Sequence, residues 1–210
     1  MKTLNRQISA IAGIMTAIVL AVTPWVVNAQ SIYKLSPAGG ASIKVSGSSN
    51  LHDWTMVSNS TMESQGEFKF DAGNQLLSLA SFTFTVNAKS LKSGHDLMDS
   101  RTYAAIKAGK FPLITYRLSS AEIRQEQKDK YLIKAIGDLT IAGVTRPITM
   151  YVNANVNPDN TISCSGLEKL KLTDFKIDPP TFMFGALKVT NDLTIQFELQ
   201  YKNNQLLTKN

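Results

Sequence analysis

The sequence predicts an all-β protein: a tall barrel of about eight strands with one inserted α-helix. Apolar and polar residues alternate over long stretches such as residues 148–156 and 193–201, a pattern typical of strands that bury one face. Several of these stretches run for about a dozen residues, roughly twice the usual strand length, which indicates tall sheets. One segment, residues 94–109, has the apolar spacing of a helix instead.

Residues 1–29 have the layout of a secretory signal peptide. Lys2 and Arg6 precede an apolar run over residues 8–22, and small residues lead up to Ala29. A positively charged start, a short apolar centre and a small-residue cleavage site direct a chain to Sec-type export. The apolar run is shorter than the about 20 residues that a membrane-spanning helix requires. We therefore expect export with cleavage after Ala29.

Cleavage after Ala29 would leave residues 30–210 as one domain, because all-β barrels of this size usually do not divide. We expect this mature domain in a periplasm or outside the cell, with no membrane-spanning segment. An uncleaved membrane anchor is the alternative. Pro24 argues against it, because proline interrupts a spanning helix.

Charge and cysteine content narrow the class of protein. The formal net charge is +6, or +4 without Lys2 and Arg6, and the remaining basic residues are scattered along the chain. Such a distribution does not predict a nucleic-acid partner. Cys164 is the only cysteine, so the fold contains no internal disulfide. We interpret Cys164 as a buried small apolar residue, with a reactive thiol or an intermolecular disulfide as alternatives.

The predicted strands are the alternating stretches, and turn sequences such as Asp71-Ala-Gly-Asn and Asn157-Pro-Asp-Asn separate them. They cover residues 31–36, 40–48, 61–71, 76–89, 112–124, 130–141, 145–157, 161–175 and 188–202. Closing about eight strands into a barrel removes the exposed edges. It also leaves an interior that either fills with side chains or holds one small ligand.

The predicted helix covers residues 94–109. Asp96 and Asp99 lie in its first turns, where the helix dipole favours negative charge. Gly109 can end the helix and Pro112 cannot continue it. A single helix between strands is suited to cover one mouth of the barrel as a lid.

Several motifs follow one another in the order of a known family. They are residues 90–94 (Ser-Leu-Lys-Ser-Gly), Met98-Asp99, residues 110–116 (Lys-Phe-Pro-Leu-Ile-Thr-Tyr), residues 137–147 (Gly-Asp-Leu-Thr-Ile-Ala-Gly-Val-Thr-Arg-Pro) and residues 192–199 (Asp-Leu-Thr-Ile-Gln-Phe-Glu-Leu). Through these motifs the chain resembles the YceI-like family of polyisoprenoid-binding envelope proteins. The resemblance implies an elongated, antiparallel, lipocalin-like barrel that binds an isoprenoid lipid, a quinone or a similar amphiphile. It implies no further cofactor and permits a homodimer.

Two segments differ from the best-described members of that family. Residues 51–54 (Leu-His-Asp-Trp) and residues 177–185 are typical of a branch of the family. The resemblance therefore leaves the head group of the ligand open.

Aromatic and apolar residues from three regions are candidate ligand contacts. Some share one strand face, some lie on the predicted helix and the strand after it, and some lie in a loop that Pro179 and Pro180 stiffen. The candidates are Phe82, Phe84, Val86, Met98, Tyr103, Ile106, Phe111, Tyr116, Phe182 and Phe184. The alternative is that they form a filled core without a cavity.

Three residues are candidates to contact a ligand head group. Trp54 can stack on such a group, and Arg101 or Arg146 can pair with a phosphate. The alternative for residues 52–54 is a turn with an exposed polar pair, and the alternative for the arginines is simple solvation.

Catalysis and metal binding are not predicted. The sequence has no Gly-x-Ser-x-Gly motif, and neither His52 nor His95 has a nucleophile beside it. A metal site would require the stretches around both histidines to meet in space. We therefore predict a non-catalytic binding protein. The alternatives are an envelope interaction protein with a filled barrel, and a hydrolase or isomerase.

Overall fold

The alternating stretches form strands in the computed structural model, which describes residues 30–36, 40–182 and 184–204. The predicted signal peptide, residues 1–29, lies outside the described residues. The elements in chain order are β1 (Gln30–Leu35), β2 (Ser42–Ser49), β3 (Asp53–Ser58), β4 (Met62–Phe70), β5 (Leu76–Asn87), η1 (Ala88–Ser90), α1 (Asp96–Ala105), β6 (Leu113–Gln127), β7 (Lys130–Ile141), β8 (Val144–Val156), β9 (Ile162–Lys171), η2 (Leu172–Phe175), β10 (Thr181–Phe182) and β11 (Leu187–Asn203).

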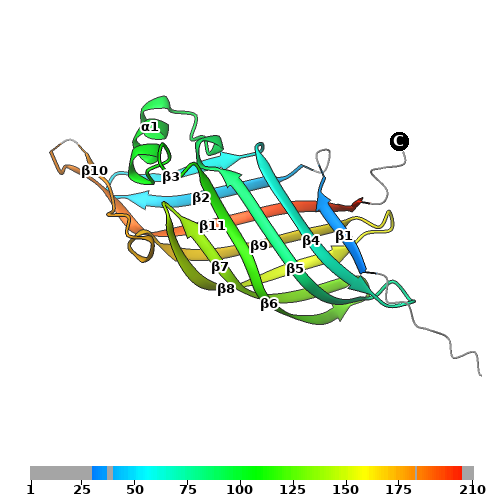
Figure 1. Cartoon of the computed structure of the whole chain (residues 1–210). Helices are drawn as coiled ribbons and strands as arrows, with labels where there is room; N and C mark the ends of the chain where they lie inside the picture. Colours follow the sequence, from blue (N-terminus) through cyan, green and yellow to red (C-terminus); the bar gives the residue numbers. More distant parts are fainter. Residues whose placement is uncertain (1–29, 37–39, 183, 205–210) are drawn as a thin grey trace, which may run out of the picture.

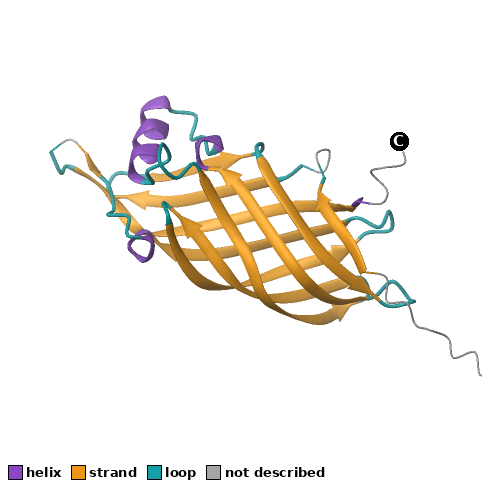
Figure 2. Cartoon of the chain, in the orientation of Figure 1, coloured by secondary structure: helices purple, strands orange, loops and turns teal. Residues whose placement is uncertain are grey.

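Eight of the strands close into an antiparallel ring. The order is β1-β4-β5-β6-β7-β8-β9-β11, and β1 pairs with β11 to complete it. The result is an elongated barrel with α1 at one end (Figures 1 and 2). The predicted lipocalin-like barrel of about eight strands with one inserted helix is thus confirmed.

Strands β2 and β3 extend the wall at the end of the barrel that carries α1 (Figure 1). Strand β1 pairs with the last residues of β11, and β2 pairs with β11 farther along, between Val189 and Glu198. Strand β3 then pairs with β2, and a single bridge joins Val57 to Lys92 just before the helix. This end of the barrel, which we call the α1 end, is therefore built from more segments than the opposite end.

The turn between β7 and β8 explains part of the motif over residues 137–147. Ala142 and Gly143 both have positive φ, 51° and 77°, as the two-residue turns that match strand twist require. Pairing continues without a break from Ile141 opposite Val144 to Lys130 opposite Asn155. Two long strands thus form one regular hairpin.

Three elements differ from the sequence prediction. Residues 53–58 form strand β3, which the sequence did not predict. The strand was missed because a polar residue, Ser58, takes the next buried position after Trp54 and Met56 and interrupts the apolar pattern. Strand β10 has two residues, too short to give a periodic pattern. Strand β9 ends at Lys171 rather than at residue 175, because residues 172–175 turn into the short helix η2.

Helix α1 is shorter than the predicted segment, which continues past Ala105 as turns with Lys107 at a φ of 53°. Asp99 is buried in its first turn and accepts hydrogen bonds from the Ser93 amide (2.8 Å) and hydroxyl (2.7 Å). These bonds tie the preceding loop to the helix, so Asp99 does more than complement the helix dipole.

The end of the barrel opposite α1 is filled with buried side chains. Tyr33 packs edge-on against Phe68, with ring centroids 5.3 Å apart, and also contacts Phe70 at 5.8 Å. Tyr131 is 3% exposed, and its hydroxyl accepts a hydrogen bond from the Leu76 amide at 3.1 Å. These residues fill the interior at this end of the barrel.

Candidate ligand-binding cavity

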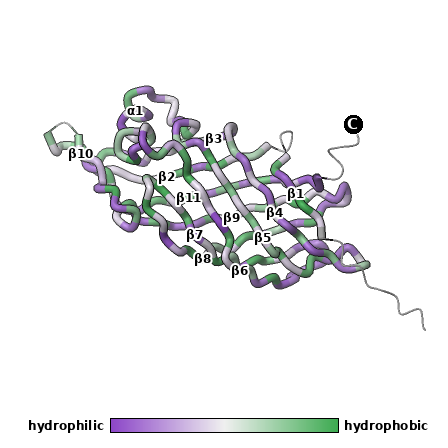
Figure 3. The backbone as a smooth tube through the Cα atoms, viewed as in Figure 1, coloured by the Kyte–Doolittle hydropathy of each residue, from purple (hydrophilic) through white to green (hydrophobic). Residues whose placement is uncertain are grey.

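The middle of the barrel holds a cavity of about 210 Å³ whose wall exposes no polar atom. Hydrophobic and hydrophilic residues alternate along the strands (Figure 3). Since successive side chains of a strand point to opposite faces, such alternation gives each strand one apolar face. The wall includes Ile43, Val45, Trp54, Met56, Phe82, Phe84, Val86, Leu91, Ile106, Ile114, Tyr116, Leu118, Ile133, Ala135, Leu139, Ile141, Ile148, Met150, Val152, Cys164, Glu168, Leu170, Ile195, Phe197, Leu199 and Tyr201.

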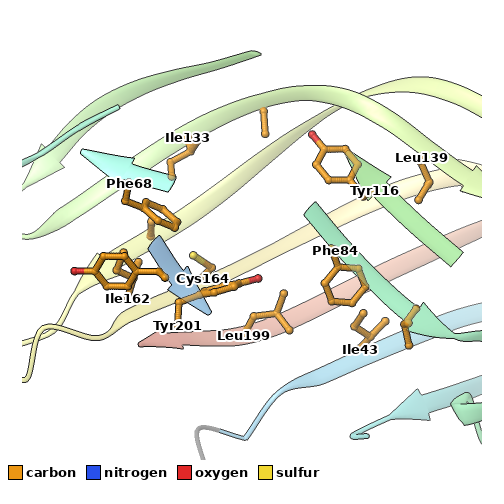
Figure 4. Packing of buried hydrophobic residues seen from close by; sticks show 14 of the residues in the cluster. Ile43, Phe68, Phe84, Tyr116, Ile133, Leu139, Ile162, Cys164, Leu199 and Tyr201 are labelled. Carbon is orange, nitrogen blue, oxygen red and sulfur yellow. The ribbon is translucent and has the colours of Figure 1, made fainter. Parts of the chain in front are cut away.

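The predicted strand contacts meet at this wall. Phe82, Phe84 and Val86 lie at alternate positions of β5, and Tyr116 of β6 stands directly opposite Phe84. In Figure 4, Phe84 and Tyr116 are seen among the buried side chains of the interior. Ile106, just after α1, also lines the cavity. Contact of these residues with a ligand stays a prediction.

Other predicted contacts from the helix region lie outside the cavity wall. The Tyr103 hydroxyl donates to the carbonyl oxygen of Leu91 at 2.7 Å, so the ring braces the loop before the helix. Phe111 packs on Gly143, where only a glycine leaves room for the ring. Met98 is half-buried on α1 and does not line the cavity. These three residues are close to the α1 end in the sequence, but their side chains contact other parts of the protein.

The loop aromatics do not fold into the mouth either. The Phe182 ring lies under the Arg101 guanidinium, 4.3 Å from its carbon to the ring centroid. This contact joins α1 to β10 and occupies Arg101, which is not part of the cavity wall. Phe184 is fully exposed. The predicted roles of these residues in ligand contact are therefore not supported by their positions.

Trp54 and Arg146 differ in their relation to the cavity. The Trp54 ring lies in the wall, packs on Gly47, and donates through Nε1 to the carbonyl oxygen of Ser48 at 3.2 Å. Arg146 donates through Nε to the Asp174 carbonyl at 2.6 Å and joins β8 to η2. Trp54 thus offers an apolar surface rather than an exposed stacking platform.

Sequence reasoning missed the wall residues on β7, β9 and β11. Ile133, Ala135 and Leu139 line the cavity from β7, and Leu199 lines it from β11. The alternation of apolar and polar residues in these strands could have identified them. The prediction missed them because it selected mainly aromatic residues. The missed residues make most of the wall aliphatic.

Cys164 lies in the cavity wall and is buried, so its interpretation as a buried small residue is confirmed. Burial raises the pKa of its thiol to about 12. The thiol therefore stays protonated near neutral pH and is a poor nucleophile.

Tyr116 carries a buried hydroxyl that has no hydrogen-bond partner among the described residues. The hydroxyl lies over Gly137, whose missing side chain leaves room for it. Burial, with a smaller effect of the Asp138 charge, raises the pKa of Tyr116 to about 12. Because the cavity wall exposes no polar atom, this hydroxyl faces protein rather than the cavity.

Within residues 30–36, 40–182 and 184–204, no group of three His, Cys, Asp or Glu side chains lies close enough to hold a metal ion. The described helices are all too short or too polar to cross a membrane.

The fold and the cavity define a lipocalin-like barrel with an apolar interior. The profile of the YceI-like domain matches residues 33–201, and the chain belongs to that family.

A UPF0312 protein of Vibrio vulnificus is 32% identical over 119 residues, which cover 53% of this chain and 60% of that relative. A UPF0312 protein of Enterobacter is 29% identical over 142 residues, or 63% of this chain and 68% of the relative. The chain thus spans somewhat under two thirds of the length of the Vibrio relative.

Two solved structures share the fold. BcnA of Burkholderia cenocepacia is 20% identical with a TM-score of 0.61, and the match covers 79% of this chain and 98% of that one. A polyisoprenoid binding domain from Saccharophagus degradans is 12% identical with a TM-score of 0.58, covering 81% and 98%. These likenesses support the barrel over most of the described chain.

Proposed function

We propose that this protein is a non-catalytic carrier that holds the apolar chain of an isoprenoid or similar amphiphilic lipid in its barrel. The observation that carries the proposal is the cavity of about 210 Å³ with a wholly apolar surface. It is larger than the about 150 Å³ apolar cavity that stays dry and takes up benzene in an engineered protein. An apolar chain is the kind of ligand that such a surface accepts.

Energetics support a ligand over an empty cavity. At about 24 cal/mol per Å³, a void of about 210 Å³ costs a folded protein about 5 kcal/mol. That is a large part of the about 5–15 kcal/mol by which domains are stable. At about 0.3 kcal/mol per heavy atom, a twenty-carbon chain contributes about 6 kcal/mol, a dissociation constant of tens of micromolar.

Family membership supports the same class of ligand, since one structural relative is described as a polyisoprenoid binding domain. His52 and His95 are not among the residues of the described cavity wall, and the buried Cys164 thiol has a raised pKa, which favours binding over catalysis. The cavity also disfavours the alternative of a filled barrel. We propose that the carrier acts after export, in a periplasm or outside the cell.

The test is native mass spectrometry of the protein purified from the envelope of its own host, followed by solvent extraction of any lipid. A stoichiometric long-chain lipid is the expected result. A lipid-free protein that also refuses added isoprenoids and fatty acids would refute the proposal and favour an envelope interaction protein.

A further inference from the structure

The hydrogen-bonded wall of the barrel opens on one side. Strands β8 and β9 pair from Val156 opposite Ile162 to Val152 opposite Gly166, and no pair follows. Beyond that point β9 continues to pair with β11, as far as Lys171 opposite Asp192. Residues 144–151 of β8 and residues 167–171 of β9 are therefore separated edges, and we call the space between them the lateral seam.

The lateral seam leads to the cavity. Ile148 and Met150 on one edge, and Glu168 and Leu170 on the other, all line the cavity wall. The hydrogen bond from Arg146 to the Asp174 carbonyl closes the seam at the α1 end. The cavity therefore extends up to a part of the wall that backbone hydrogen bonds between β8 and β9 do not close.

Glu168 is the acidic residue of the described cavity wall. It lies on the inward row of β9, between Gly166 and Leu170, and its side chain accepts a hydrogen bond from the Lys169 amide. Burial raises the pKa of this carboxyl, and none of the ion pairs among the described residues includes it. Because the surface of the cavity itself exposes no polar atom, this carboxyl lies at the edge of the apolar space, where it can still accept hydrogen bonds.

The other openings lack a comparable group. Pairing between β5 and β6 also stops, at Thr83 opposite Arg117, but the inward residues beyond it are Leu79, Phe82 and Leu118. At the α1 end, Phe175 and Ile177 are only 2% and 3% exposed and cover the interior. The wall at the α1 end also includes Thr102, whose hydroxyl is neutral, so the lateral seam is the opening where the described wall offers a carboxyl.

We propose that the polar end of the bound lipid lies in the lateral seam beside Glu168, and that this end is neutral and donates a hydrogen bond, as a hydroxyl does. The inference rests on the proposed function, because the apolar wall must first hold the chain. A hydroxyl can donate to the Glu168 carboxylate in a strong charge-assisted bond. A phosphate would bring about two negative charges beside this carboxyl, which burial already disfavours as an anion. The one cation of the described wall, Lys171, is exposed to solvent at the end of the same edge, where its charge is screened.

The experiment compares geranylgeraniol with geranylgeranyl monophosphate, which share one chain and differ at the polar end. Isothermal titration calorimetry is run on the full chain and on the Glu168→Gln variant, which keeps an acceptor and removes the charge. Glu198→Gln is the matched control, because Glu198 is exposed on the outer face of β11. The same variants are checked for an unchanged far-ultraviolet spectrum.

Wild-type protein should bind the alcohol at least about tenfold more tightly than the phosphate. Glu168→Gln should lower alcohol affinity by about three- to tenfold, because the hydrogen bond loses its charge, and raise phosphate affinity about tenfold, whereas Glu198→Gln should change neither. Equal wild-type affinities, or a preference that Glu168→Gln leaves unchanged, would overturn the inference while leaving the carrier function intact. If wild-type protein binds neither probe, the carrier function fails and the inference falls with it.

Discussion

Tyr116 and Tyr131 provide a paired test of how the interior of the barrel is packed. Both are buried, 5% and 3% exposed, but the Tyr116 hydroxyl has no partner among the described residues and the Tyr131 hydroxyl accepts from the Leu76 amide. Replacing each by phenylalanine removes the same oxygen atom. The two changes should therefore shift stability in opposite directions.

Tyr116→Phe should stabilise the protein by about 1–3 kcal/mol, because it removes an unsatisfied buried hydroxyl. Tyr131→Phe should destabilise it by about 1–3 kcal/mol, because it leaves the Leu76 amide buried without an acceptor. For a chain of this size each kcal/mol moves Tm by about 2–4 °C. Thermal and urea denaturation followed by circular dichroism measure both shifts.

The pH dependence gives an independent readout for Tyr116. Burial raises its pKa to about 12, whereas an unfolded tyrosine titrates near 10. As pH rises, Tyr116 therefore loses its proton at a lower pH in the unfolded protein than in the folded protein. The contribution of this group to the free energy of unfolding is fully present below about pH 10 and is lost between about pH 10 and 12. Tyr116→Phe should make that decline shallower.

Ligand affinity completes the test. Since the hydroxyl is not exposed to the cavity, Tyr116→Phe should bind the same twenty-carbon alcohol within about threefold of wild type. Destabilisation by Tyr116→Phe, or a tenfold loss of affinity, would show that the hydroxyl has a partner or a ligand role and would refute this reasoning.

Three further predictions concern the wall, the thiol and the amino terminus. A folded Phe84→Asp variant should bind isoprenoid at least about 100-fold more weakly, because a carboxylate enters the apolar wall. If solvent extracts as much lipid from this variant as from the wild type, Phe84 does not line the binding site. Cys164, with a pKa of about 12, should react with a thiol reagent at pH 8 at least about 100-fold more slowly in the native than in the urea-unfolded protein. Comparable rates would mean that the thiol is accessible. Amino-terminal sequencing of protein from its own host should begin at Gln30, and an intact Met1 would count against the signal peptide.

Periodicity alone predicted the inward rows of several strands. Phe82, Phe84 and Val86 alternate on β5, and the structure places all three in the cavity wall. A period of two is a local property of an extended chain, so it can be read without knowing which strands pair. The same property explains why β3 was missed, because buried Ser58 interrupts its apolar row.

The helix region shows where local patterns stop being informative. The sequence predicted a helix between the strands, and α1 is there. It did not predict that Tyr103 would bond to the Leu91 carbonyl or that Arg101 would stack on Phe182. The partners of such side chains come from segments that are distant in the chain, so spacing carries no information about them.

By itself, the sequence determined the all-β class, the long strands, the single helix and the apolar inner faces, because each depends on residues that are neighbours along the chain. Only the tertiary structure decided how far each pair of strands runs together. That pairing leaves the interior a cavity rather than a filled core, and separates β8 from β9 beyond Gly166. It also brings Glu168, an ordinary charged residue in the sequence, to the edge of an apolar space, because closure of the barrel sets which side chains share its interior.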